Sequence, residues 1–244
     1  MTNHEQIWMD HLTELRKRCI RVLIFFVIAL FSAFCFVPKI IDFITLTSTL
    51  VDVDLNVFNI TDPLLLHLKI ASIVAFIASF PYIIIELWLF IRPGLTKDER
   101  RFVYKYIPMI FILFILGIAF SYFILVPYYI RFSQGLAGNV DLNIVMGANT
   151  YIDFLSKMLL YFGLIFQFPV LVFILSYIGI VSSQLLKAIR KYAYFGLLIV
   201  CAFITPPDPI SMGIAFVPLA FLYEFSMLLC KVNESKKRKK LKTS

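Results

Sequence analysis

Six apolar runs restrict what this sequence can fold into. They occupy residues 20–37, 70–91, 106–127, 158–178, 192–205 and 210–230. A bilayer core about 30 Å thick needs roughly 20 apolar residues as helix, and backbone polar groups in lipid must pair within the spanning structure. Hydrophobic residues make up 61% of the 244 residues and charged residues 16%, whereas soluble domains hold about half and about a quarter. The sequence therefore predicts an all-α polytopic membrane protein with six transmembrane helices.

The lysines and arginines predict the orientation of these spans. Of the 23 in the chain, 18 lie in the two tails and in the gaps after the second and fourth runs, and a nineteenth, Arg21, lies at the start of the first run beside the N-terminal tail. Such residues accumulate on the cytoplasmic side of a membrane, so both termini are expected inside. We expect one integral membrane domain over 1–244, with a cytoplasmic tail at 1–19, the membrane region at 20–230 and a basic cytoplasmic tail at 231–244. Residues 236–240 could bind nucleic acid or anionic lipid, but a solvated tail that sets topology is the favoured interpretation, without nucleic acid as a partner.

The fifth run is unusually short. Only 14 residues separate Lys191 from Pro206, about 21 Å of helix at 1.5 Å per residue. The turn 205–209 carries three prolines, which end a helix and restrict the residue before them. The fifth and sixth helices are therefore expected to be short and to form a close hairpin, with a thinned bilayer or a partner at the short end.

The remaining gaps and the glycines give weaker signals. Residues 38–69 and 128–157 are expected to form short interfacial helices, with Thr61 and Asp62 marking a helix start before Pro63. Only 9 glycines occur, which argues against helix seams packed through glycine.

The sequence contains no pattern typical of an enzyme. Its three histidines do not pair at metal-ligand spacing, and the P-loop, GxGxxG and GxSxG motifs are absent. The four cysteines form no CxxC pair and are interpreted as small apolar residues. We expect no catalytic activity, no metal and no cofactor.

Three polar residues lie inside the apolar runs, where ionisable groups are costly. Glu86 is interpreted as a surface carboxylate that snorkels to the headgroups. For Glu224, a helix-packing or partner-contact role and an ordinary surface role both remain open. Gln167 could hydrogen-bond to a neighbouring helix or to a partner subunit.

Two other acids are embedded in basic segments predicted to face the cytoplasm. Glu14 lies in HLTELRKR (residues 11–18), and Glu99 lies in PGLTKDERR (residues 93–101). The simplest interpretation is an internal salt bridge on a solvated face.

Four motifs together resemble the TatC family of twin-arginine protein translocases. They are HLTELRKR before the first run, PGLxxxERR in the second gap, FGxxFQFP at 162–169 and TPPD at 205–208. The resemblance covers most of the chain, in the family's order. It implies a receptor for signal peptides that carry two consecutive arginines, which passes folded proteins to a translocation assembly.

The resemblance also implies roles for individual residues. Signal-peptide recognition is expected at Glu14, Glu99, Arg16, Arg18, Phe90, Pro93 and Leu95. Gln167 matches a polar position in the membrane interior that is often glutamate in the family, and a glutamine is less suited to a proton-linked role there. Asp208 matches an acid of the outer turn.

The partners and the membrane follow from the same resemblance. The implied partners are single-span subunits of the TatA and TatB kind, signal peptides, the bilayer and further copies of the chain. The proton gradient supplies the energy, and a bacterial cell membrane is favoured over an organelle membrane. The competing hypothesis, a secondary transporter, predicts broken helices, charges at the midplane and internal repeats, none of which is evident in the sequence.

Overall fold

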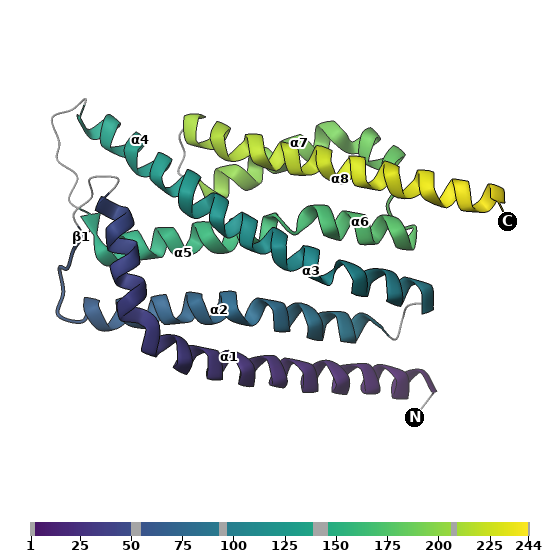
Figure 1. The fold of residues 1–244 in the computed structure, drawn as a ribbon, viewed down its shortest axis with the longest axis horizontal. Coiled ribbons are helices and arrows are strands. Elements are labelled where there is room, and N and C mark those ends of the chain that lie inside the picture. Colours follow the sequence, from purple (N-terminus) through teal and green to yellow (C-terminus); the bar gives the residue numbers. More distant parts are fainter. Residues whose placement is uncertain (1–2, 50–54, 93–96, 139–145, 206–208, 244) are drawn as a thin grey trace. The chain divides into compact units, whose positions relative to one another are not determined.

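The computed structural model describes residues 3–49, 55–92, 97–138, 146–205 and 209–243 (Figure 1). Its elements in chain order are α1 (Asn3–Thr49), β1 (Leu55–Asn56), α2 (Asp62–Ile91), α3 (Lys97–Phe120), the π-helical turn η2 (Ser121–Leu125), α4 (Val126–Gly138), β2 (Met146–Gly147), α5 (Ala148–Ile165), α6 (Phe168–Ile178), α7 (Ser183–Ile204) and α8 (Pro209–Thr243). The two-residue strands pair in parallel, and all the other elements are helices. The predicted all-α class is confirmed.

The chain divides into two compact units. The first contains residues 1–100 and 144–154, and the second contains residues 101–143 and 155–244. In the first unit α1 packs along α2, and α1 bends where Pro38 interrupts it (Figure 1). A proline inside a helix removes one backbone hydrogen bond and clashes with the preceding turn, which accounts for the bend.

The start of α2 is the one that the sequence predicts. Thr61 is the N-cap residue and Pro63 lies in the first turn. The Asp62 carboxylate accepts hydrogen bonds from the backbone amides of Phe58, at 3.1 Å, and Asn59, at 2.9 Å. Further along α2, Lys69 forms an ion pair with Asp153 of α5 at 2.7 Å, which ties the two helices together within this unit.

Two glycines let α3 and α5 approach closely in the second unit. A Cβ on Gly117 would lie 2.5 Å from the carbonyl oxygen of Phe162, and a Cβ on Gly163 would lie 2.8 Å from the Phe114 ring. The expectation that scarce glycines form no packed seam is therefore wrong. A close approach needs glycine only at the points of contact, so the number of glycines in the chain does not bear on it.

Helices α6, α7 and α8 form the other part of this unit. Their core contains Val172, Leu186, Tyr223, Met227 and Cys230, all buried. The Tyr223 hydroxyl donates a 2.6 Å hydrogen bond to the Leu186 carbonyl, which joins α8 to α7. These contacts confirm the predicted α7–α8 hairpin.

Two expectations about helix lengths are wrong. No separate short helix fills the described parts of the two long gaps, because α1 runs on to Thr49, α4 continues from η2 without a break and α5 begins at Ala148. The sixth helix is not short, since α8 has 35 residues. Its sequence after Cys230 is rich in lysine and arginine, which are good helix formers and extend the helix past its apolar run.

Five of the described helices are long and apolar enough to cross a membrane. They cover Leu12–Thr45, Asp62–Ile91, Tyr106–Ala137, Ala148–Ile178 and Pro209–Ser235. Large apolar side chains are exposed along them, for example Phe31 at 73% and Phe221 at 68%. A surface this apolar needs lipid to cover it, so the chain is a multi-pass membrane protein. Helix α7, which contains the predicted fifth span, is not among the five.

Candidate functional site

The first predicted acid lies on α1 and already holds an arginine. Glu14 and Arg18 are four residues apart, so they occupy the same face of the helix. The Arg18 Nε donates to Glu14 Oε1 at 3.1 Å, and Arg18 Nη2 donates to the same oxygen. The Glu14 side chain is 34% exposed and that of Arg18 is 14% exposed. A carboxylate at this position can therefore bind a guanidinium group and still be reached by a ligand.

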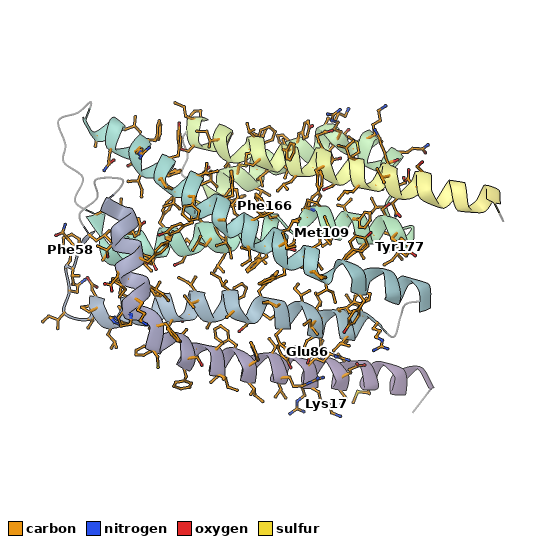
Figure 2. The ribbon with its side chains drawn as sticks, viewed as in Figure 1. Lys17, Phe58, Glu86, Met109, Phe166 and Tyr177 are labelled. Atoms are coloured by element: carbon orange, nitrogen blue, oxygen red, sulfur yellow. The ribbon has the colours of Figure 1, made fainter. Side chains whose placement is uncertain are left out.

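The same arginine also reaches α2. Its Nη1 lies 3.0 Å from Glu86 Oε2, while Arg21 Nη1 lies 2.8 Å from Glu86 Oε1. The Tyr82 hydroxyl donates to Glu86 Oε1 at 3.0 Å. Glu86 itself is only 3% exposed, and it lies between α1 and α2 along the stretch that carries Lys17 (Figure 2).

Glu86 is therefore not a snorkelling surface carboxylate, and that interpretation is wrong. A carboxylate five residues from a helix end could reach the headgroups, but here two arginines and a tyrosine satisfy it inside the α1–α2 seam. A buried charge is tolerated only when it is paired and hydrogen-bonded. The charged cluster consists of two acids, Glu14 and Glu86, and two arginines, Arg18 and Arg21, and it therefore has no net formal charge.

An apolar groove adjoins the charged cluster. It has a volume of about 380 Å³, and Arg18 and Glu86 line it together with apolar side chains of both helices, among them Leu15, Phe26 and Phe90. This volume lies within the range of ligand pockets. A polar anchor beside an apolar groove suits a ligand with charged residues next to an apolar stretch.

The second unit holds two further polar sites. Glu224 on α8 forms a 2.7 Å ion pair with Arg190 of α7 and accepts a hydrogen bond from the Tyr194 hydroxyl. Gln167 lies where the helix breaks between α5 and α6, and its Nε2 donates to the Gly163 carbonyl at 3.3 Å. Its Oε1 is buried without a hydrogen-bond partner among the described residues.

Comparisons with known proteins identify the family. The family model described as "Sec-independent protein translocase protein (TatC)" matches residues 10–218. The TatC of Halalkalibacterium halodurans is 42% identical over 239 residues, which cover 98% of this chain and 94% of the relative. The chain belongs to the TatC family.

Other members agree with this assignment. TatCy of Bacillus subtilis is 39% identical over 231 residues, covering 95% of this chain and 91% of the relative. A crystal structure of a twin arginine translocase receptor, TatC, matches with a TM-score of 0.80 at 31% identity and covers 92% of this chain and 99% of its own. The relatives are named as protein translocase components, and the TatC family accounts for both the membrane fold and the four motifs.

The structure describes only part of the predicted recognition residues. Arg16 is exposed on α1, and Phe90 lines the groove near the end of α2. Pro93, Leu95 and Asp208 lie outside the described residues, and although Glu99 belongs to the first turns of α3, its side chain is not among those described. The structure therefore brings together Glu14, Arg18 and Phe90, and the joint use of Glu14 and Glu99 stays a prediction.

The resemblance to TatC did not single out Glu86 or Arg21. A signal for Arg21 was present, because positions 14, 18 and 21 follow the 4,3 spacing of one helix face. A carboxylate on an otherwise apolar helix also needs a cationic partner. Basic residues lie both before the first run and after the second, so the sequence does not say which of them supplies it. Of the roles left open for Glu224, the structure supports helix packing, since Glu224 joins α8 to α7.

Proposed function

We propose that this TatC chain is the receptor and core subunit of a twin-arginine translocase, and that it exports folded proteins across the membrane. The signal peptide's two arginines bind Glu14 and Glu99 on the cytoplasmic side. Arg16, Arg18, Phe90, Pro93 and Leu95 complete the recognition surface. The observation that carries the proposal is that the partly exposed Glu14 carboxylate accepts two hydrogen bonds from one guanidinium group.

The chemistry of the pairs explains why arginine is preferred over lysine. Arginine presents a planar fork of donors to a carboxylate, whereas lysine presents a point charge. Fully exposed ion pairs contribute about 0–1 kcal/mol each, too little to separate one class of signal from another. At an effective dielectric constant near 20, a close pair gains up to about 4 kcal/mol before desolvation. The partial burial of Glu14 supports a partly desolvated site, in which an ion pair is stronger than on an exposed surface.

The proposed topology has six spans with both termini in the cytoplasm. The positions of the lysines and arginines support it. In this topology α7 is the fifth crossing segment in chain order, despite its short apolar stretch, and is added to the five long apolar helices. In a bacterial cell membrane this topology puts Glu14, the second gap and the basic tail on the side where signal peptides are made.

The proposed partners are TatA-like and TatB-like single-span subunits and further copies of the chain. Gln167 and Glu224 supply polar groups for such contacts, because the buried Gln167 Oε1 has acceptor capacity and the Glu224 ion pair is partly exposed. The proton motive force drives transport, and the proposal needs no nucleotide or cofactor.

The receptor role is tested by site-specific photo-crosslinking in native membranes. A photoreactive residue replaces Leu15, next to Glu14, or Asp98, next to Glu99, so that both acids stay in place. Labelled peptides carry either two arginines or two lysines. We expect crosslinks to the twin-arginine peptide only. Equal crosslinking to both peptides, or none to either, contradicts signal recognition at these positions.

A further inference from the structure

The recognition acid Glu14 is occupied by a group of the same chemistry as its proposed ligand. Arg18 places Nε and Nη2 on Glu14 Oε1, which is the fork-like contact that an incoming arginine would make. Because Arg18 belongs to the same helix, its effective concentration at Glu14 is far above that of any peptide. A signal arginine must therefore displace this side chain or share the carboxylate with it.

Arg18 has a second acid within reach. Its Nη1 already lies 3.0 Å from Glu86 Oε2, and the other oxygen of Glu86 is taken by Arg21 and Tyr82. If Arg18 leaves Glu14, its guanidinium group can turn fully onto Glu86 Oε2 without crossing the seam. No charge is left unpaired by this movement, so its cost is small compared with stranding a buried charge.

We propose that the part Arg18 plays in the recognition surface is that of a built-in competitor for Glu14, and that Glu86 is the acid that receives Arg18 when a signal arginine arrives. The inference rests on the proposed role of Glu14 in signal binding. A lysine cannot replace the two hydrogen bonds that Arg18 gives up, whereas an arginine can. The competition therefore raises the apparent dissociation constant of both peptides by the same factor. A lysine peptide, which binds Glu14 more weakly, is then the one left without useful affinity.

The competition predicts tighter binding when Arg18 is removed. The assay measures dissociation constants of twin-arginine and twin-lysine signal peptides for the full chain in lipid nanodiscs. In Arg18→Gln we expect about tenfold tighter binding of the twin-arginine peptide, the effect of one charged hydrogen bond, and a gain of the same size for the twin-lysine peptide. Arg18→Lys keeps the charge but loses the fork, and we expect an intermediate result.

Arg21→Gln is the matched control. It removes the same charge from the same helix face, but Arg21 contacts Glu86 and not Glu14. If binding tightens only because the surface has lost one positive charge, Arg18→Gln and Arg21→Gln should lower the dissociation constants of both peptides equally. Competition predicts the full gain of about tenfold for Arg18→Gln and a clearly smaller gain for Arg21→Gln, which only frees Glu86 to receive Arg18.

Glu86 is tested through its dependence on Arg18. Glu86→Gln removes the alternative acid, which leaves Arg18 more firmly on Glu14, so binding of the twin-arginine peptide should weaken several-fold. In the Arg18→Gln background the same change should have no effect, since Glu86 acts through Arg18. An undiminished effect in that background means that Glu86 contacts the signal directly and overturns the exchange.

Glu14→Gln separates failure of this inference from failure of the proposed function. If Glu14→Gln leaves binding unchanged, the receptor role of Glu14 is wrong and the exchange falls with it. If Glu14→Gln weakens binding and Arg18→Gln also weakens it or leaves it unchanged, the receptor role stands and the competition is refuted. Thermal unfolding of each variant in the same nanodiscs confirms that the folded chain is what is measured.

Discussion

The buried carboxylate of Glu86 offers the sharpest test of how the first unit is held together. Glu86 is 3% exposed, forms ion pairs with Arg18 and Arg21, and accepts a hydrogen bond from Tyr82. Removing one partner of a buried ion pair costs about 3–5 kcal/mol when the other charge is left uncompensated. In Glu86→Ala the Arg18 side chain still has its ion pair with Glu14, and the Arg21 side chain, which is 50% exposed, can be hydrated by water. We therefore expect Glu86→Ala to lower the free energy of unfolding by about 2–3 kcal/mol, below the full penalty.

Two further variants calibrate this number. Glu86→Gln keeps an acceptor oxygen in place and should cost less, about 1–2 kcal/mol, because hydrogen bonds to arginine remain while the charge pairing is lost. Glu14→Ala removes a 34% exposed partner of Arg18 and should cost at most about 1 kcal/mol. The measurement is equilibrium unfolding in mixed micelles with an increasing fraction of denaturing detergent. A cost for Glu86→Ala no larger than that for Glu14→Ala would refute the account of Glu86 as a buried anchor.

Three other predictions follow from the same contacts. Gly117→Ala should destabilise the second unit by about 1–3 kcal/mol because the new methyl meets the backbone of α5, while the control Gly135→Ala, with open space around its Cβ, should be neutral or slightly stabilising in the same unfolding assay. Glu224→Gln should loosen the α7–α8 hairpin by about 1 kcal/mol, seen as faster hydrogen exchange in α7; unchanged exchange would contradict the pairing. Glu14→Gln and Glu99→Gln should each reduce export of a folded twin-arginine reporter nearly as much as the alanine variants; normal export in both would exclude charge pairing with the signal.

The helical class and most membrane spans could be predicted because lipid leaves few alternatives. A run of apolar residues near 20 long has to form a helix in a bilayer, and the structure has spans that enclose five of the six predicted runs. The ends of the helices could not be predicted in this way. Once a helix leaves the apolar core, propensity and tertiary packing decide where it stops, so α1 and α8 continue well past their apolar runs.

The site could be predicted only in part, for a different physical reason. Motif residues such as Glu14 are recognisable by their neighbours in the sequence. The structure confirms the internal ion pair of Glu14, made with Arg18, while its binding of a signal arginine stays a prediction. The roles of Glu86 and Gly117 depend on which helix lies opposite each of them, and the hydropathy of the sequence does not identify that helix. A carboxylate near a helix end is equally compatible with snorkelling and with a buried ion pair until the position of α1 is known.

The distribution of polar groups along the helices follows the cost of burying charge. Three interhelical ion pairs among the described residues join an apolar run to a basic segment: Arg18 and Arg21 pair with Glu86, and Arg190 pairs with Glu224. All three arginines lie at or beside the lysine- and arginine-rich parts of α1 and α7. Near such ends water and headgroups can supplement each pair, which lowers the desolvation penalty. Gln167, in the middle of its run, is polar but uncharged, and at that depth an amide costs far less than a carboxylate.

If Gln167 acts only as a neutral hydrogen-bonding group, the carboxyl of a Gln167→Glu variant has to be protonated for the variant to fold as well as the parent. The stability of this variant in detergent should then fall as pH rises through the pKa of the new carboxyl. A pH-independent stability for Gln167→Glu would instead show that water or a cation reaches this position, and the environment of the helix break would have to be polar.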